Sequence, residues 1–408
     1  MAKSELSFLL PLMEKFNAHV KVLSDRRIRE EMTRIGVAKE GQEIMENKAK
    51  FYIVKIENLP IKDAIILKQE ALSLGMDCAV SWNVVSLKAE KTDALLFGTK
   101  KQFDFLTKKM FIQPFNGREL SEEINEAISN FENEFYVWKF RDDSLDLSNV
   151  CVMGILNVTP DSFSDGGKFF DRQKALEHAE RMVEEGADII DIGAESTRPG
   201  STPIDAKEEI SRLSMVLDDL SSLTVPVSVD TYKPEVAQFA LDHGAKIIND
   251  VFGLRKEGMM EVIKRYDAGV IIMHMKGEPQ TMQQNPAYEN VTSEVIQFLR
   301  ERSLEAIRFG IKKENIAIDP GIGFGKRLEH NITLLRELQS FKSLGFPIVV
   351  GVSRKGFIGE ILERDVNERL IGSVASALFA VMNGASIIRA HDVRETKEAI
   401  RMLEALRK

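Results

Sequence analysis

Side chains that can accept hydrogen bonds or bind anions follow a series of apolar runs in the last two thirds of the chain. The runs end in Asn157, residues 195–198, Asp230, residues 249–250, His274, Asp319, residues 353–355 and residues 389–391. Carboxylate and amide oxygens suit a ligand rich in N–H donors, such as an amino-pyrimidinone ring. Arginine and lysine bind phosphate groups. The set therefore indicates an enzyme site for a nitrogen heterocycle and an anion.

Four of these residues, Asp230, Asn249, Asp250 and Asp319, directly close apolar runs. Burial of a carboxylate without hydrogen-bonding partners is costly. Backbone amides of the following loop can satisfy any one of them, and for each residue alone that alternative stays open. Taken together, the four predict a pocket that accepts hydrogen bonds from a ring.

The last two runs supply positive charge. Lys355, Arg389 and His391 are expected to form an anion site, in which Arg389 holds phosphate through two parallel hydrogen bonds and Lys355 acts as a point charge. The two-residue spacing of Arg389 and His391 places both on one face of a strand. A core histidine bonded to its neighbours is the alternative for His391.

The first loop, residues 157–167, is long and polar. It contains Pro160, Gly166 and Gly167, and we expect it to open and close over a ligand. The amide oxygen of Asn157 is a hard ligand of the type that Mg²⁺ prefers. An ordinary loop rich in turn-forming residues is the alternative.

Two further loops carry side chains that can contact a ring. Residues 196–202 contain Arg198, for which a solvated arginine in a turn is the alternative. Residues 319–326 form a glycine-rich loop without the spacing of a P-loop. Phe324 at its tip is expected either to stack against an aromatic ligand or to anchor the loop.

These residues come together only if the strands before them all point the same way. Strands are predicted at 151–158, 188–194, 225–230, 246–251, 269–275, 316–319, 347–352 and 386–391, and helices at roughly 172–186, 205–222, 234–243, 258–266, 291–310, 329–343, 367–383 and 395–407. Near-continuous apolar runs suit a parallel sheet covered on both faces. The pattern predicts a (β/α)8 TIM barrel, with its site at the carboxyl ends of the strands. An open doubly wound sheet is the alternative, but its glycine fingerprint after the first strand is missing.

The front of the chain predicts a second, smaller α/β domain. Strands are expected at 51–57, 77–81, 94–98 and 135–140, and helices at 60–74 and 119–132. The polar residues 141–149 are expected to be a linker. This divides the chain into an accessory domain of unassigned role, 1–148, and a catalytic barrel, 149–408.

Composition narrows the class of protein. The chain has 408 residues, of which 44% are hydrophobic and 29% charged, and a formal net charge of −8. This charge argues against nucleic-acid binding, and no apolar run is long enough to span a membrane. No signal peptide is visible, and Cys78 and Cys151 do not have a metal-type spacing. We expect a cytoplasmic protein with two reduced thiols.

As a set, the motifs resemble the dihydropteroate synthase family of pterin-binding barrels over residues 151–408. The segments that carry the resemblance are 157–167, 191–200, 229–231, 248–250, 273–275, 319–326, 353–355 and 389–393. The resemblance implies a magnesium-dependent transferase of folate biosynthesis. In its reaction p-aminobenzoate attacks the exocyclic methylene of dihydropterin pyrophosphate, pyrophosphate leaves and 7,8-dihydropteroate forms. The resemblance also implies a homodimer.

The same resemblance assigns roles to single residues. The pterin contacts would be Asp230, Asn249, Asp319 and Lys355. The pyrophosphate contacts would be Asn157, Thr197, Arg389 and His391, with Mg²⁺ on Asn157. The p-aminobenzoate contacts would be Arg198, Pro199, Phe324 and Ser353, and the first loop contributes Phe163, Ser164 and Asp165. Of these, Asp165, Lys355, Arg389 and His391 are the predicted catalytic residues, with Asp165 near the developing pterin cation.

Two other functions stay open at this point. A methyltetrahydrofolate–corrinoid methyltransferase would share the acidic pterin contacts but would need no pyrophosphate site. A non-catalytic pterin-binding barrel would act as a scaffold for the accessory domain. The sequence departs from the family pattern at Lys276, where a glutamine is more common, and at Ala194, where a glycine is more common. The accessory domain is the largest departure.

Overall fold

A computed structural model of the chain describes residues 21, 25–84, 86, 88–158, 168–195, 203–220, 222–278 and 281–407. By compactness the chain divides into two units, Met1–Glu126 and Ala127–Lys408. The boundary predicted at residue 148 therefore falls inside the second unit.

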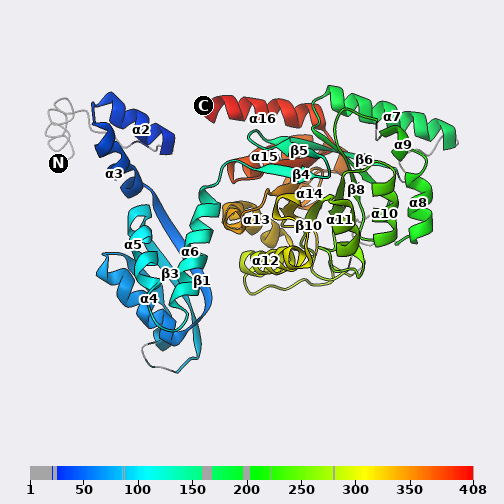
Figure 1. Cartoon of the computed structure of the whole chain (residues 1–408). Coiled ribbons are helices and arrows are strands. Elements are labelled where there is room, and N and C mark those ends of the chain that lie inside the picture. The colour runs from blue at the N-terminus through cyan, green and yellow to red at the C-terminus, as the bar shows by residue number, and fades with distance from the viewer. Residues whose placement is uncertain are drawn as a thin grey trace, which may run out of the picture. The chain divides into compact units, whose positions relative to one another are not determined.

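The first unit is a small antiparallel sheet with helices packed on one face (Figure 1). Its elements are α2 (Asp25–Arg34), α3 (Lys39–Ala49), β1 (Phe51–Pro60), α4 (Ile61–Ser73), β2 (Asp77–Val80), β3 (Lys91–Thr99), α5 (Lys100–Met110) and α6 (Gly117–Glu132), of which the last continues into the second unit. The strand order is β1–β3–β2. Leu67, Leu96 and Leu106 are fully buried, whereas Phe51 and Ile53 of β1 are each 59% exposed. The predicted α/β character of this part is confirmed.

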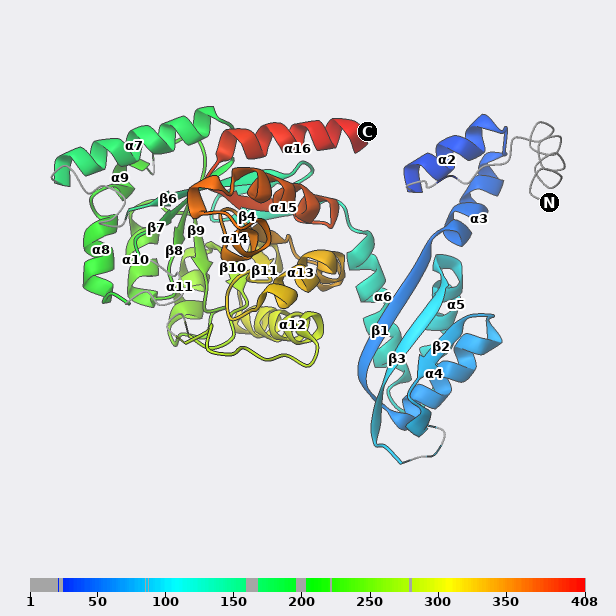
Figure 2. The same cartoon turned by 180° about the vertical axis from the view of Figure 1, so that it is seen from behind.

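The second unit contains the predicted barrel (Figure 2). Its strands are β6 (Cys151–Asn157), β7 (Ile189–Gly193), β8 (Val227–Asp230), β9 (Ile247–Asp250), β10 (Gly269–Met273), β11 (Ile316–Asp319), β12 (Val349–Gly351) and β13 (Ile387–Ala390). They are parallel, in the order β11–β10–β9–β8–β7–β6–β13–β12, and a parallel bridge between Ile318 and Ile348 joins the two ends. The TIM-barrel prediction is confirmed.

Helices surround this barrel and explain why its strands read as unbroken apolar runs. They are α7 (Lys168–Glu184), α8 (Ala206–Leu213), α9 (Leu217–Leu220), α10 (Pro234–Asp242), α11 (Met259–Tyr266), α12 (Val291–Phe309), α13 (Leu328–Arg336), α14 (Gly356–Leu362), α15 (Leu370–Met382) and α16 (Val393–Arg407). Side chains such as Ile190, Ile248 and Ile272 are fully buried in the core that the strands share with these helices. Because such a strand is covered on both faces, its apolar side chains do not alternate with polar ones along the sequence.

A hairpin closes the amino-terminal end of the barrel. It consists of β4 (Val137–Phe140) and β5 (Asp143–Asp146), paired antiparallel. Trp138 and Phe140 are fully buried against residues at the starts of the barrel strands, namely Cys151, Ile189, Ile247, Ile271, Val349 and Ile387. The Trp138 indole N–H donates to the carbonyl of Asn315 at 2.9 Å. The prediction that residues 141–149 are a linker was wrong, because the polar side chains there belong to the solvent face of this hairpin.

Among the described residues, none of the helices combines the length and the apolar character needed to cross a bilayer. Cys78 and Cys151 are both buried and free, as expected for reduced thiols.

Candidate functional site

Arg389 lies at the centre of a group of polar side chains at the carboxyl ends of the strands. Its Nε donates to Asp191 at 2.6 Å and its Nη2 donates to Asp230 at 3.0 Å. Asn249 donates to the same Asp191 oxygen at 3.2 Å. The structure thus brings Arg389, Asp230 and Asn249 together. One edge of the guanidinium, formed by Nε and Nη2, is therefore already bound to two carboxylates.

Asp191 was missed in the sequence. It lies inside the run that forms β7, five residues before the 196–202 loop, and its side chain is fully buried. A carboxylate within an apolar strand costs free energy unless it is paired. Its position between isoleucines was therefore a usable signal of a partner elsewhere, although it did not identify Arg389.

Two buried carboxylate oxygens in this group have no hydrogen-bond partner among the described residues. They are Oδ1 of Asp191 and Oδ1 of Asp230. Burial raises the pKa of Asp230, and the nearby Arg389 opposes that rise. A buried acceptor without a partner is costly, so such atoms mark places where a ligand N–H can supply the missing bond.

Lys355 and Asp319 belong to the same cluster. Burial lowers the pKa of Lys355 to about 8, while the charges of Asp319 and Asp230 raise it and that of Arg389 lowers it further. The Lys355 ammonium donates to the carbonyl of Ile322 and lies 4.6 Å from the centroid of the Phe324 ring. Acidic and cationic side chains therefore lie close together in this cluster.

Asp319 and Asp250 differ in what occupies their oxygens. Oδ1 of Asp319 accepts the Gly321 amide at 2.6 Å, and burial raises the pKa of this carboxyl. Both oxygens of Asp250 are taken, by the amides of Phe252 at 2.7 Å and Leu254 at 2.9 Å. Asp250 therefore fits the alternative of a carboxylate whose oxygens accept the backbone amides of the loop after β9.

His391 and Ser353 form a pair at the ends of β13 and β12. The Ser353 hydroxyl oxygen lies 3.0 Å from Nδ1 of His391 and accepts the backbone N–H of His391 at 3.2 Å. Both side chains thus hold one another at the site. The side chain of Arg354, the residue after Ser353, does not join this pair. It makes a two-point ion pair with Asp392, with contacts of 3.1 and 2.5 Å.

The remaining predicted residues fall into two groups. Asn157 ends β6 half-buried, and its Oδ1 lies 3.3 Å from the place that a β-carbon on Gly193 would take. Phe163, Ser164, Asp165, Thr197, Arg198 and Pro199 lie outside the described residues. Within the described ranges there is no cluster of three or more acidic, histidine or cysteine ligands for a metal ion.

A second buried ion group, also missed in the sequence, lies beside the site. Lys233 donates to Glu195 at 2.7 Å and to Glu209 at 2.6 Å, and its side chain is only 11% exposed. Glu195 also accepts the amide of Ile204 at 3.1 Å. One carboxylate thereby ties together residues on the two sides of the 196–202 loop. Pairing between three separate segments is not visible in a sequence pattern.

We expect Lys233→Met to destabilise the fold by about 3–5 kcal/mol, because it leaves two buried carboxylates without a cation. Urea unfolding would measure the change. The control is Lys312→Met, which removes a cation from an exposed pair with Asp267 at 2.6 Å and should change the free energy of unfolding far less. Equal losses in the two variants would contradict the assignment of Lys233 as a buried clamp.

Comparison with known proteins gives the following matches. A family model described as "Pterin binding enzyme" matches residues 153–391. Dihydropteroate synthase of Escherichia coli is 48% identical over 263 residues, which is 64% of this chain and 93% of that protein. The crystal structure of dihydropteroate synthase from Thermus thermophilus in complex with 4-aminobenzoate covers 66% of this chain and 99% of its own, with 47% identity and a TM-score of 0.61.

One relative extends over the first unit as well. The bifunctional dihydropteroate synthase/dihydropteroate reductase of Helicobacter pylori is 35% identical over 391 residues. The alignment covers 95% of this chain and 98% of that protein. The likeness therefore includes the part of the chain that precedes the barrel.

Proposed function

This chain belongs to the dihydropteroate synthase family of pterin-binding enzymes, and from that premise we propose how its barrel joins p-aminobenzoate to dihydropterin pyrophosphate. The aniline nitrogen forms a bond to the exocyclic methylene and gives up a proton. The C–O bond to the diphosphate breaks, and the leaving group takes the electron pair. The products are 7,8-dihydropteroate and pyrophosphate.

The observation that carries this proposal is the meeting of unpartnered acceptors and buried cations at one end of the barrel. Oδ1 of Asp230 has no partner among the described residues, and Asn249 and Asp319 lie in the same site. A pterin presents N–H donors to such groups. Beside them, Arg389 and Lys355 supply charge for an anion. We assign the pterin to Asp230, Asn249, Asp319 and Lys355.

The pyrophosphate is assigned to Arg389 and His391, together with Asn157 and Thr197. Pyrophosphate is a poor leaving group until its negative charge is offset, and pre-placed cations offset it as the C–O bond stretches. The carbon left behind is positive, and we place Asp165 near it as a stabilising carboxylate. The aniline nitrogen is already nucleophilic and needs no strong general base. The substitution is therefore dissociative in character.

Mg²⁺ is part of the proposal. The Asn157 side-chain oxygen is a hard ligand of the type that Mg²⁺ prefers, and Mg²⁺ takes few protein ligands where diphosphate oxygens and water supply the others. When bound, the ion would neutralise charge on the leaving diphosphate. The predicted cytoplasmic location stays a prediction.

The test is an assay of pyrophosphate release from the full chain with p-aminobenzoate and dihydropterin pyrophosphate, with and without Mg²⁺. Release that requires both substrates is the expected result. Binding of the pterin alone should tighten when pyrophosphate is added. A methyltetrahydrofolate–corrinoid methyltransferase would show neither effect, and a non-catalytic barrel would bind pterin without turnover.

A second activity, reduction of dihydropteroate, is favoured by the alignment that runs through both units. Its relative is named for both a synthase and a reductase. Reduction of 7,8-dihydropteroate adds a hydride and a proton to one C=N bond, so the reaction needs a hydride donor such as a reduced nicotinamide or a reduced flavin. We propose that the first unit contributes this step. The test supplies dihydropteroate and each donor to the full chain and follows tetrahydropteroate. Absence of product with both donors would reject the second activity.

A homodimer is proposed through the outer faces of α15 and α16. Ile371, Phe379 and Met382 of α15 and Met402 and Leu406 of α16 are large apolar side chains with 45–82% of their surface exposed. The two helices pack against one another, and large apolar side chains left exposed on neighbouring helices favour an association surface. Light scattering of the wild-type chain and of Ile371→Glu decides it: we expect a dimer that the substitution dissociates, and a monomeric wild type would reject it.

A further inference from the structure

A segment between β10 and α12, residues 281–290, lies against the glycine-rich loop that carries Phe324. We name this segment the strap. Gln283 of the strap donates to the carbonyl of Gly323 at 2.7 Å. Tyr288 of the strap donates through its hydroxyl to the carbonyl of Gly325 at 2.8 Å. The two accepting carbonyls stand on either side of Phe324, so the strap holds the backbone at this residue from both directions.

The carbonyl of Phe324 itself also has a side-chain donor. Lys326 donates to it at 3.0 Å, and the same Nζ lies 2.9 Å from Nδ1 of His274. Burial and neighbouring cations hold the pKa of His274 well below its usual range, so its ring is neutral and can accept at Nδ1. Three successive carbonyls, those of residues 323, 324 and 325, are thus each bound by a side chain.

The loop needs such support because of its backbone. Gly321, Gly323 and Gly325 have φ values of +69°, +85° and +60°, in the left-handed region that favours glycine. A β-carbon on Gly325 would lie 2.5 Å from the Lys276 carbonyl oxygen. Glycine loses much conformational freedom on folding, and these glycines offer no side chains to pack. The conformation of the loop therefore depends on side-chain donors, two from the strap and one from Lys326 at the end of the loop.

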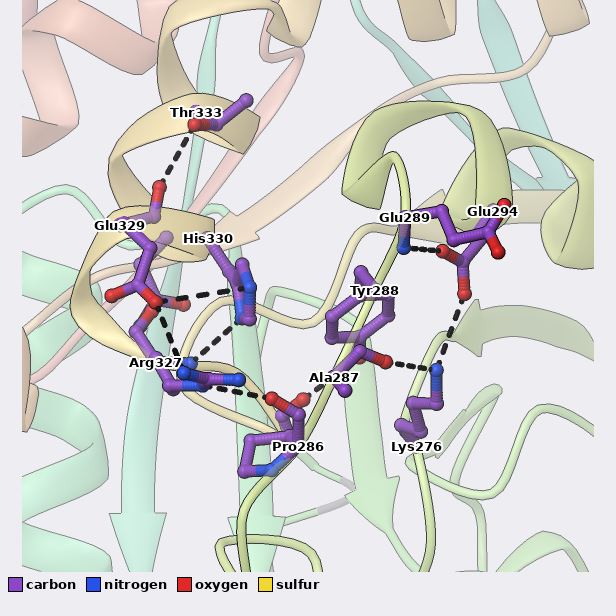
Figure 3. Close-up of polar contacts among 12 residues, drawn as sticks. Lys276, Pro286, Ala287, Tyr288, Glu289, Glu294, Arg327, Glu329, His330 and Thr333 are labelled. Atoms are coloured by element: carbon purple, nitrogen blue, oxygen red, sulfur yellow. Dashed lines mark hydrogen bonds and ion pairs between the residues drawn. The ribbon is translucent and has the colours of Figure 1, made fainter.

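Tyr288 is held firmly enough to act as such a support. Figure 3 shows its ring between His330 and Lys276, with a T-shaped contact to the imidazole at 4.8 Å and the ammonium 4.1 Å from the ring centroid. Lys276 is anchored in turn by the carbonyl of Ala287 at 2.5 Å and by Glu294 at 3.2 Å.

The strap is also fixed to α13 and α12. Arg327 donates to the carbonyl of Pro286 at 2.9 Å, and Glu294 accepts the amide of Glu289 at 2.7 Å (Figure 3). Support therefore reaches both ends of the Pro286–Glu289 stretch. The strap is a braced part of the barrel.

We infer that Gln283 and Tyr288 are positioning residues for the arylamine half of the reaction. They fix Phe324 against Lys355, whose ammonium lies 4.6 Å from the phenyl centroid. The inference rests on the proposed function, because it takes Phe324 to contact p-aminobenzoate. Neither strap residue bonds directly to a proposed pterin contact or to Arg389. The strap reaches Lys355 through Phe324, so we expect its main effect on the arylamine.

The test compares Tyr288→Phe and Gln283→Met with wild type in the full chain. Tyr288→Phe keeps the ring between His330 and Lys276 and removes only the hydroxyl donor. We expect each variant to raise the KM for p-aminobenzoate about three- to tenfold, as the loss of one net hydrogen bond predicts. The KM for dihydropterin pyrophosphate and kcat should stay within about twofold. A general loss of packing would lower kcat and change both KM values.

The matched control is Tyr266→Phe, which removes a tyrosine hydroxyl that donates to Asp242 at 2.5 Å at the end of α11. It should change neither KM. If wild type lacks pyrophosphate release, the proposed function fails and the inference fails with it. If wild type is active but both strap variants keep the p-aminobenzoate KM within twofold, or change the pterin KM equally, the inference alone is overturned. Gln283→Met decides the matter if Tyr288→Phe does not fold.

Discussion

Replacing Arg389 by methionine is expected to lower kcat/KM for dihydropterin pyrophosphate by about a thousandfold or more. The guanidinium is the cation that Asp191 and Asp230 share, at 2.6 and 3.0 Å, and it is the cation that we assign to the diphosphate. Loss of one pre-placed donor to developing negative charge costs about 10²–10³ in rate. Here the loss is larger, because the two carboxylates left behind repel the same anion.

The same substitution should also destabilise the fold by about 3–5 kcal/mol, since it leaves two buried carboxylates without their cation. A double variant, Arg389→Met with Asp191→Asn, separates the two effects. It removes one of the opposing charges, so urea unfolding should show stability partly restored while activity stays lost. If activity returned with stability, Arg389 would be a structural cation only.

Arg389→Lys gives an intermediate result. Lysine keeps the charge but cannot engage both carboxylates along one planar edge. We expect a folded protein with reduced turnover. A lysine variant with full activity would show that charge alone matters at this position, and that the geometry around Asp191 does not.

The barrel could be predicted from the sequence because its strands are covered on both faces. All eight predicted strands are present, at or within two residues of their expected ends, for example 316–319 as Ile316–Asp319. Continuous apolar runs at regular spacing leave few other folds. The helix α14, Gly356–Leu362, was missed because a seven-residue segment with two glycines has little helical periodicity. The predicted helix 205–222 is broken into α8 and α9.

The first unit was predicted less completely. Helix α5, Lys100–Met110, was missed because four lysines in eleven residues hide its apolar face, although Phe103, Leu106 and Met110 are buried. Its capping box, formed by Thr99 and Gln102, was a readable signal at the start of the helix. An antiparallel sheet that is covered by helices on one face only does not need continuous apolar runs, so its sequence carries a weaker signal than that of the barrel.

Only those site residues that lie at the ends of strands could be predicted from the sequence. Strand-end residues such as Asp230, Asp319 and Arg389 converge because parallel strands share one edge. Asp191 and Lys233 form ion pairs with residues that are distant in the sequence, and the spacing of residues along the chain does not predict such pairs. The strap is a loop whose donors bind backbone carbonyls, and carbonyls are present at every residue. Sequence patterns therefore locate a site more readily than they explain its rigidity.

Raising the pH through about 8 is expected to lower kcat/KM for dihydropterin pyrophosphate, because burial lowers the pKa of Lys355 to about 8. Above that pH the free protein loses a positive charge that faces the anion. The effect on stability has the opposite sign. Between about 8 and the ordinary lysine pKa of 10.5, the folded state binds fewer protons at this group than the unfolded state, so its contribution to stability rises with pH. A fall in kcat/KM in this window is therefore not unfolding caused by Lys355.

Lys355→Met tests the assignment. We expect kcat/KM to fall about 10²–10³-fold at pH 7, the cost of one pre-placed cation, and the decline above pH 8 to disappear. Lys355→Arg should keep part of the activity and should also lack the decline, because arginine stays charged throughout. The control is Lys397→Met, which removes a half-buried lysine that pairs with Asp188 at 2.6 Å, away from Arg389 and Asp319. A Lys355→Met variant that kept the wild-type decline above pH 8 would place the titrating group elsewhere.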